Sequence, residues 1–229
     1  MTSHTAGKHK GIIFDIDGVL IDSYRAHLQS WQQVAHRYGR EMTEEEFART
    51  FGRTSREIIR ELWKAVAFGD EEIEAFDQEK EATFREIVAG AYPWMEGAEA
   101  LIAALFEARY SLAVGSSGPK ENVHLMLSQL AQREWITGAV SGSDVTYGKP
   151  HPEVFETAAK TLGITPTLCA VIEDAAAGIS AANAAGMVSI GLISTGHDRR
   201  EYAEADHVVT HLSELSPTVI AKWIDAQND

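Results

Sequence analysis

Short apolar runs alternate along this chain with longer segments whose apolar residues recur at helical spacing. Five runs read as buried strands, because each is brief and several end in Gly, Ser or Asp; they are residues 12–14, 112–114, 168–172, 188–192 and 207–209. Segments 121–130, 152–162 and 179–185 have the apolar face of an amphipathic helix. Strands that alternate with helices predict the α/β fold class, with a mostly parallel sheet covered by helices on both faces.

One interval between the first two strands breaks this rhythm. Residues 22–91 contain no good strand, but helical stretches are expected at 24–38, 44–51, 55–66 and 71–88. Thr43 and Ser55 are helix-start signals for two of them. Because about seventy residues are far more than a crossover needs, we expect a helical subdomain at 22–91, inserted into a core made of 1–21 and 92–229.

The composition is that of an ordinary globular protein. The chain has 229 residues, of which 45% are hydrophobic and 24% charged, enough for one core or a core with an insert. A net charge of −14 argues against a general nucleic-acid binder, since phosphate-backbone binding needs a basic face. The same charge would repel an anionic substrate, so a phosphate site here would need a local cation such as a metal.

The single cysteine and the polar N-terminus bear on location. Cys169 can form no intrachain disulfide, which suits a reducing cytosol, and its apolar surroundings predict a buried, inert thiol. No apolar stretch is long enough to span a membrane, and residues 1–10 read as a frayed end without the apolar segment of a secretory signal. We therefore expect a cytoplasmic protein.

The strongest chemical signal is a pair of acids, Asp15 and Asp17, directly after the first predicted strand. Ligands bind at the carboxyl ends of strands in an open parallel sheet, and Gly18 would let the chain turn there at little cost. Asp15 could attack phosphorus and form an aspartyl phosphate. Asp17 could protonate the leaving oxygen and then activate water. The alternative is that both acids merely cap a turn.

Two further segments could bind phosphate. Ser116, Ser117 and Gly118 follow the second predicted strand, where a hydroxyl and backbone N–H groups could hold phosphate oxygens. The spacing is not that of a Walker A loop, and an ordinary turn is the alternative. Lys149, flanked by Gly and Pro, could pair with phosphate and with the nucleophilic carboxylate, or lie on the surface before a helix.

A second acid pair, Glu173 and Asp174, follows the run at 168–172. Adjacent acids on a sheet edge repel one another, and Mg²⁺ chelated by Asp15 and Asp174 would relieve this. Asp174 could also cap the following helix, which is compatible with metal binding. Four successive strand ends would thus carry a nucleophile pair, a hydroxyl, a lysine and an acid pair, the parts of a phosphoryl-transfer site.

At these residues the chain resembles the haloacid dehalogenase superfamily. The similarity covers nearly the whole chain and rests on four motifs in order: DIDGVL at 15–20, the hydroxyl after the second strand, GKPHPEVF at 148–155 and EDAAAGISAA at 173–182. The resemblance implies a Rossmann-like core with a helical cap inserted after the first motif. True dehalogenases of the superfamily lack the second acid of the first motif, so Asp17 argues against dehalogenation.

The resemblance also implies how the site residues are used. Mg²⁺ would be held by oxygen atoms of Asp15, the backbone carbonyl of Asp17, Asp174 and, directly or through a neighbour, Glu173. Ser116 and Lys149 would bind the transferring phosphoryl group.

Within the superfamily the chain is most similar to the group of β-phosphoglucomutase and phosphoglycolate-type phosphatases. His27 and Lys80 resemble the cap His and Lys of the mutase. The cap loop at 52–56 resembles the loop that closes over substrate. The predicted substrate-binding residues are therefore Ser117, Gly118, His27, Gly52, Arg53, Arg56 and Lys80.

Structural roles are the alternative for the cap residues. His27 could pack near Trp31, Lys80 could lie on a solvated face, and Arg53 and Arg56 could pair with the acids at 57 and 61. Arginine at position 53 cannot form the Schiff base that a phosphonate-cleaving relative would use, so that chemistry is disfavoured.

Three departures from the mutase pattern favour a phosphatase. Phe51 stands where the mutase has a lysine, Gly118 stands at the later of two hydroxyl positions, and Ala175 replaces a serine after the fourth motif's acids. The sequence therefore predicts a Mg²⁺-dependent phosphatase of a small phosphorylated metabolite, a sugar phosphate or phosphoglycolate-like compound, acting through an aspartyl phosphate. A phosphomutase and a non-catalytic metabolite-binding protein are the alternatives. We expect neither nucleic-acid nor membrane partners, and a monomer or weak homodimer.

Overall fold

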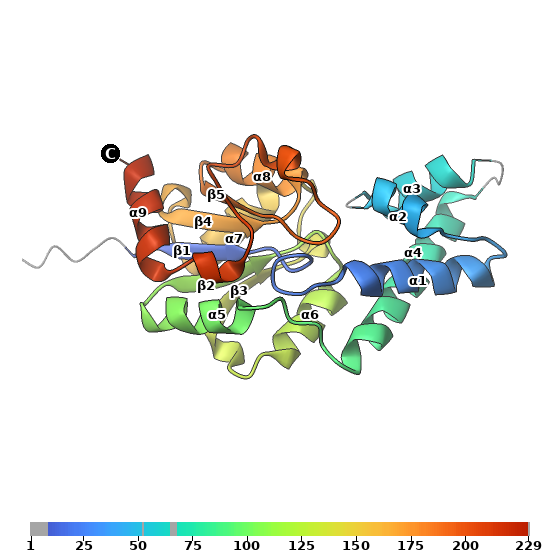
Figure 1. The fold of residues 1–229 in the computed structure, drawn as a ribbon, viewed down its shortest axis with the longest axis horizontal. Helices are drawn as coiled ribbons and strands as arrows, with labels where there is room; N and C mark the ends of the chain where they lie inside the picture. Colours follow the sequence, from blue (N-terminus) through green and yellow to red (C-terminus); the bar gives the residue numbers. More distant parts are fainter. Residues whose placement is uncertain (1–8, 52, 65–67, 229) are drawn as a thin grey trace, which may run out of the picture. The chain divides into compact units, whose positions relative to one another are not determined.

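The computed structural model describes residues 9–51, 53–64 and 68–228 of the chain. The chain forms two compact units, a core unit of Met1–Ile21 with Trp94–Asp229 and a cap unit of Asp22–Pro93 (Figure 1). The cap unit ends at Pro93, whereas the predicted range stops at 91.

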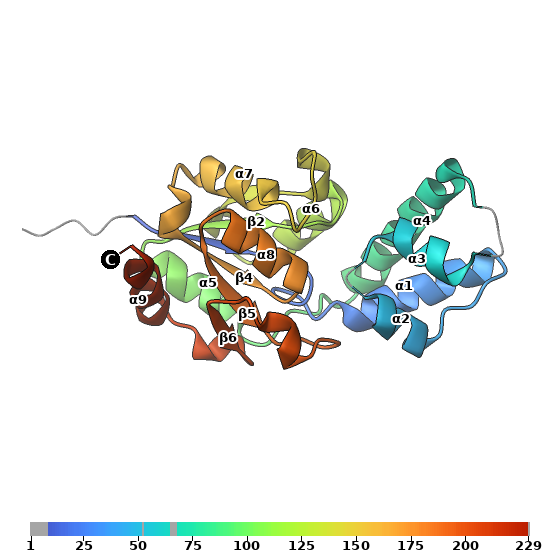
Figure 2. The ribbon, with the colours of Figure 1, turned by 90° about the horizontal axis from the view of Figure 1, so that it is seen from above.

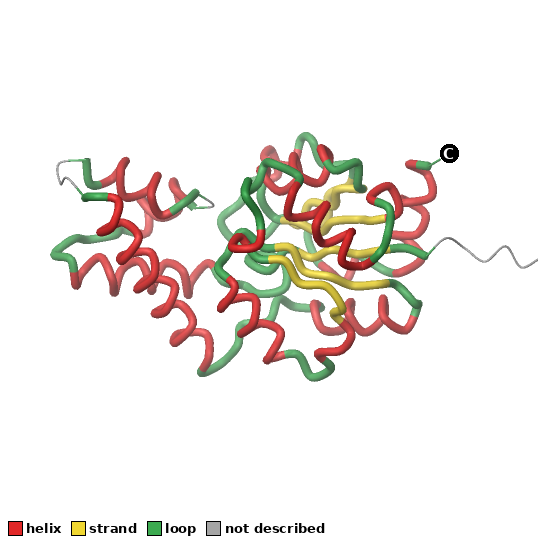
Figure 3. The backbone as a smooth tube through the Cα atoms, turned by 180° about the vertical axis from the view of Figure 1, so that it is seen from behind, coloured by secondary structure: helices red, strands yellow, loops and turns green. Residues whose placement is uncertain are grey.

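A parallel sheet forms the centre of the core unit. Within the described residues it has six strands in the order β3-β2-β1-β4-β5-β6, and every neighbouring pair is parallel (Figure 3). The strands are β1 (Gly11–Phe14), β2 (Ser111–Gly115), β3 (Ile136–Val140), β4 (Cys169–Glu173), β5 (Val188–Leu192) and β6 (His207–Val209). The predicted α/β class with a Rossmann-like parallel sheet is confirmed.

Helices cover both faces of this sheet. They are α5 (Ala98–Glu107), α6 (Lys120–Gln129), α7 (Glu153–Leu162), α8 (Ala176–Ala184) and α9 (Pro217–Gln227). Helices α7 and α8 pack on one face, and α5 and α9 pack on the other (Figure 2). A cluster of buried side chains joins α7 and α8 to the sheet, with Phe155 and Val171 fully buried in it. Strands covered on both faces are continuously apolar, as the sequence pattern predicts.

Strand β3 is absent from the sequence prediction. Its side chains alternate between buried and exposed positions, the pattern of a strand with only one covered face, and β3 is an edge strand that pairs only with β2. Ile136, Gly138 and Val140 are the inward-facing residues, and a glycine among them leaves too little apolar signal for a strand.

The cap unit consists of helices packed around aromatic side chains. The helices are α1 (Tyr24–Arg37), α2 (Glu44–Thr50), α3 (Ser55–Leu62) and α4 (Asp70–Ala89). Thr43 caps α2 as predicted, but Thr54 rather than Ser55 caps α3, and each forms a capping box with a Glu three residues later. Trp31 and Phe76 lie in the buried cluster, with ring centroids 5.2 Å apart.

In the part of the chain that the structure describes, no helix combines the length and apolar character needed to cross a bilayer.

Candidate active site

Three neighbouring parallel strands end at the predicted site. β1 leads directly into Asp15, whose N–H donates to the carbonyl of Ile172 at 2.9 Å. β2 leads into Ser116, while β4 ends at Glu173 and Asp174 follows it. Because β1 lies between β2 and β4, the parallel register brings these residues to one edge of the sheet.

Gly18 turns the chain after the first acid pair. Its φ of +73° lies in the left-handed region, and its N–H donates to the carbonyl of Ile21 at 2.8 Å. Asp17 forms an isolated backbone bridge with Ile21 inside this turn. A Cβ atom on Gly18 would overlap the carboxylate of Asp174, so the turn and the close approach both require glycine.

Lys149 joins the two acid motifs. Its Nζ donates to Asp15 Oδ1 at 2.6 Å and to Glu173 Oε1 at 2.5 Å, and the three side chains are 7%, 9% and 1% exposed. The surface-lysine alternative is therefore wrong. The prediction that this lysine ends a strand is also wrong, because β3 ends at Val140 and Lys149 lies in the loop before α7.

The buried charges do not balance within the site. Burial raises the pKa of Asp15 to about 7, with Lys149 lowering it and Glu173 raising it further. Burial also raises the pKa of Asp174 well above its usual range, reinforced by Glu173 and Asp15. Burial disfavours the charged form of Lys149, but the two carboxylates outweigh this and its pKa lies above the ordinary value. One ammonium group faces three buried carboxylates, so the site favours a further cation.

The donor atoms present fit a magnesium ion. Oxygen atoms of Asp15, Glu173 and Asp174 lie within 4.8 Å of one another, and all three residues are buried. Carboxylate oxygens are the ligands that Mg²⁺ prefers. Glu173 already accepts from Lys149 through Oε1 and from the N–H of Ala175 through Oε2, at 2.8 Å. Asp15 and Asp174 are thus the carboxylates better placed for direct coordination.

The loop after β2 holds a buried hydroxyl at the same sheet edge. Ser116 is 2% exposed, its N–H donates to the carbonyl of Val140 at 3.0 Å, and its Oγ accepts from the N–H of Gly118 at 3.0 Å. The carbonyl of Gly118 accepts from the N–H of Gly142 at 2.9 Å. Ser117 is exposed. The loop is therefore a tight turn that presents Ser116 beside the end of β1.

The end of β5 also contributes to the site, which the sequence pattern did not predict. Ser194 donates from Oγ to Asp174 Oδ2 at 2.7 Å, and the hydroxyl of Tyr202 lies 2.5 Å from the main-chain oxygen of Asp174. The available signal was the polar run that follows the apolar segment at 188–192, at another carboxyl end of the same sheet.

Gly178, in the first turn of α8, lies against the carboxylate of Glu173. A Cβ atom there would overlap the Glu173 side chain, so Gly178→Ala is expected to lower the free energy of unfolding by about 1–3 kcal/mol, as overpacking does. This is the reverse of the usual helix preference for alanine. Urea unfolding measures the change.

Gly90→Ala is the matched control for this substitution. Nothing lies within 4 Å of a Cβ built on Gly90, whose φ is −74°, so this variant should unfold like the unsubstituted protein or slightly later. Equal stability of both variants would contradict the packing role of Gly178.

In the cap unit, His27 and Lys80 contact each other. Lys80 Nζ donates to His27 Nδ1 at 3.1 Å and to Glu81 Oε1 at 2.5 Å, and Lys80 is only 5% exposed. His27 stacks on Phe84 with ring centroids 4.0 Å apart. The solvated-face alternative for Lys80 is wrong, because the helix turns this lysine toward α1.

The two cap arginines pair with acids of the cap unit. Arg53 donates to Glu61 Oε2 at 2.5 Å, as the structural alternative predicts. Arg56 pairs with Asp70 rather than with the acids at 57 and 61. Gly52, also predicted to bind substrate, lies outside the described residues. A substrate role for either arginine would require exchanging these ion pairs.

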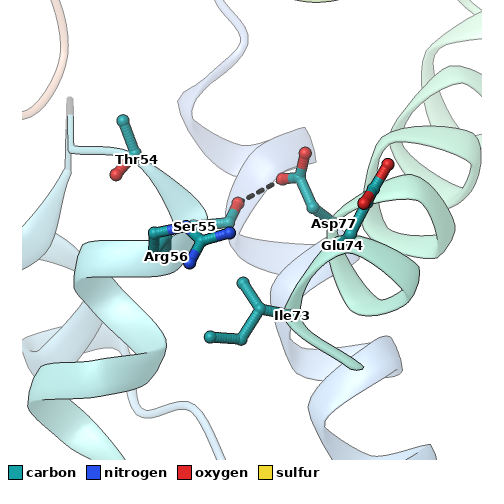
Figure 4. Close-up of a pocket in the computed structure, with 6 residues that line it drawn as sticks. All are labelled: Thr54, Ser55, Arg56, Ile73, Glu74 and Asp77. Atoms are coloured by element: carbon teal, nitrogen blue, oxygen red, sulfur yellow. Dashed lines mark hydrogen bonds between the residues drawn. The ribbon is translucent and has the colours of Figure 1, made fainter. Parts of the chain in front are cut away.

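Beside Arg56 the cap unit has a small open pocket between α3 and α4. Its volume is about 230 Å³, and it is lined by Thr54, Ser55, Arg56, Ile73, Glu74 and Asp77 (Figure 4). The hydroxyl of Ser55 donates to Asp77 across it. Polar side chains surround Ile73 in this pocket, and all six lining residues belong to the cap unit.

Fold and site define an α/β protein with a buried acid–lysine cluster at the carboxyl edge of a Rossmann-like sheet. The model of the family described as haloacid dehalogenase-like hydrolase matches residues 12–192. The chain belongs to this family, which confirms the resemblance seen in the motifs.

The names of similar proteins indicate which reactions are found among this chain's relatives. The chain is 30% identical over 207 residues to validoxylamine A 7'-phosphate phosphatase of Streptomyces hygroscopicus subsp. limoneus, covering 90% of this chain and 96% of that protein. It is 30% identical over 218 residues to β-phosphoglucomutase of Bacillus subtilis (strain 168), covering 90% and 92%. A crystal structure of β-phosphoglucomutase from Clostridium difficile superposes with a TM-score of 0.82 at 25% identity, covering 95% and 98%.

These names bear on the predicted class of enzyme. These relatives are one phosphatase and two β-phosphoglucomutases, so the prediction of an enzyme among phosphoric monoester hydrolases and phosphomutases is confirmed at that level.

Proposed function

We propose that this chain is a Mg²⁺-dependent phosphatase that hydrolyses a small phosphorylated metabolite, a sugar phosphate or phosphoglycolate-like compound, through an aspartyl phosphate on Asp15. One observation carries the proposal: the carboxylate of Asp15 lies at the end of β1, bound by Lys149 and within 4.8 Å of oxygen atoms of Glu173 and Asp174. A nucleophile, a fixed cation and a divalent-metal donor set thus lie together.

The metal ligands, Lys149 and Ser116 have separate roles in this reaction. Mg²⁺, held by Asp15, Asp174 and the carbonyl of Asp17, would supply positive charge that neutralises the phosphoryl oxygens and favours ionised Asp15. Lys149 holds one Asp15 oxygen and reduces the repulsion between carboxylate and phosphate. The Ser116 hydroxyl and nearby N–H groups bind the phosphoryl oxygens.

The reaction then proceeds in two displacements. A carboxylate oxygen of Asp15 attacks phosphorus, the bond to the substrate oxygen breaks, and Asp17 gives its proton to the departing alcohol. Asp17 next takes a proton from water, whose oxygen attacks the same phosphorus and releases phosphate from Asp15. Asp17 thus ends protonated again, by a proton from water, and Asp15 ends as a free carboxylate.

A phosphate-release screen tests this function. The full chain is incubated with sugar phosphates, phosphoglycolate, nucleotides, pyrophosphate and an aryl phosphate, with Mg²⁺ or with EDTA. We expect release from at least one small phosphate ester, a fall of about 100-fold or more in EDTA, and recovery when Mg²⁺ is restored. Turnover that is unaffected by EDTA, or none across the panel, would contradict the proposal.

A phosphomutase is the second candidate. The contact between His27 and Lys80 in the cap unit and the similarity to β-phosphoglucomutase favour it, while Phe51 and Gly118 weaken it. Incubation with β-glucose 1-phosphate and a bisphosphate primer would then yield glucose 6-phosphate. Free phosphate as the sole product would eliminate the mutase reaction.

A cytoplasmic location, a monomer or weak homodimer, and the lack of nucleic-acid partners stay predictions from composition. They agree with a small-metabolite substrate, because no extended basic surface is needed to bind one.

A further inference from the structure

The segment after β5, residues 193–202 and here called the β5 loop, contacts Asp174 in three ways. Ser194 Oγ donates to Asp174 Oδ2 at 2.7 Å. His197 Nε2 lies 3.7 Å from the same oxygen, and the hydroxyl of Tyr202 lies 2.5 Å from the main-chain oxygen. One loop therefore contacts both the side chain and the backbone of a proposed metal ligand.

The β5 loop is itself anchored to the sheet. The N–H of Ile193 donates to the carbonyl of Val209 at 2.9 Å, which extends the β5–β6 pairing. Tyr202 is 2% exposed, packs against Gly191 and has its hydroxyl 2.9 Å from the carbonyl of Leu192. These contacts hold the loop in place independently of Ser194.

The carboxylate of Asp174 is enclosed at Oδ2. A Cβ on Gly18 would overlap this oxygen and would lie 3.0 Å from Ser194 Oγ, so Oδ2 lies between the Gly18 turn and the serine hydroxyl. The torsion of an Asp carboxylate is otherwise broad, and a hydroxyl donor at Oδ2 fixes it.

We propose that Ser194 is a positioning residue of the metal site, whose hydroxyl holds the Asp174 carboxylate in the orientation that binds Mg²⁺. The inference rests on the proposed function and adds a residue from a fourth strand end. Groups that orient a metal ligand typically change metal affinity by about 10–100-fold when removed.

Isothermal titration with MgCl₂ alone tests this role on the full chain. Ser194→Ala should bind Mg²⁺ about 10–100-fold more weakly than the unsubstituted protein, and Ser194→Thr, which keeps the hydroxyl, should bind within about threefold of it. Ser180→Ala is the matched control, because Ser180 Oγ also donates to a carboxylate, Glu204 Oε2 at 3.0 Å, on the exposed surface. Its Mg²⁺ affinity should not change.

The outcomes separate this inference from the proposed function. No Mg²⁺ binding by the unsubstituted protein would remove the metal site itself. Unchanged binding by Ser194→Ala, or equal weakening in Ser194→Thr, would overturn the role of the hydroxyl and leave the site standing. A metal-free melting temperature of Ser194→Ala well below that of Ser180→Ala would assign Ser194 a purely structural role and also overturn the inference.

Discussion

Asp15→Asn is expected to reduce Mg²⁺-dependent phosphate release by on the order of 10³-fold or more, because a neutral amide cannot attack phosphorus. The amide has nearly the shape of the carboxylate, and Lys149 keeps its bond to Glu173, so the site should stay assembled. Steady-state phosphate release from the best substrate of the screen measures the effect.

The same substitution is expected to stabilise the metal-free protein at pH 8. Burial raises the pKa of Asp15 to about 7, above its usual value of 3.8, so the folded state disfavours the charge that the unfolded chain carries from about pH 4 upward. Removing that charge should raise the melting temperature in EDTA at pH 8 and have little effect at pH 3.

Asp225→Asn is the control for the aspartate substitution. Asp225 is an exposed acid on α9, 2.9 Å from Lys10, and its loss should leave turnover unchanged. Near-normal turnover of Asp15→Asn would refute the nucleophile assignment. A variant that neither turns over nor melts cooperatively would report unfolding instead, which the melting curves in EDTA reveal.

Lys149→Met should lose both activity and stability. The substitution leaves the carboxylates of Asp15 and Glu173 buried without their cation, and breaking such a buried pair typically costs about 3–5 kcal/mol. Lys149 has a raised pKa, so its stabilising contribution is fully present at neutral pH and is lost only in strong base. The loss should therefore be large at pH 8.

The pH dependence of the Lys149 variant distinguishes charge from packing. At pH 5 the unpaired carboxylates can take up protons, so the difference in unfolding free energy between Lys149→Met and the unsubstituted protein should shrink. Urea unfolding at the two pH values measures it. Lys160→Met, at an exposed position on α7, should change stability by less than about 0.5 kcal/mol. A deficit at Lys149 that is the same at both pH values would contradict the electrostatic explanation.

The local pattern of apolar residues was sufficient to predict most strands of the core unit. The runs at 12–14, 112–114 and 188–192 became strands because a strand buried on both faces is apolar at every position. β3 was not predicted because Thr137 and Ala139 face solvent and Gly138 interrupts the apolar residues on the buried face. In the cap unit the predicted N-cap of α3, Ser55, was wrong by one residue, because the hydroxyl of the adjacent Thr54 caps the helix instead.

The partners of individual side chains were harder to predict than the helices and strands. Lys80 follows Glu79 in a charged run, yet it is buried, because only the packing of α4 on α1 decides which face of the helix is covered. Arg56 has acids one and five positions away, but the packing of α3 against α4 brings it to Asp70, the first residue of α4. Ser194 carries no motif, and only its position after β5 relates it to Asp174.

The sequence by itself determined five of the six described strands and the acid pairs that follow β1 and end β4, since apolar runs and acid pairs are local features of the chain. The tertiary structure alone decided that Lys149, which lies in the loop before α7, bonds Asp15 and Glu173, and that Ser194 and Gly18 enclose one oxygen of Asp174. Those contacts depend on parallel strand order and on burial, which bring residues far apart in the chain to one edge of the sheet.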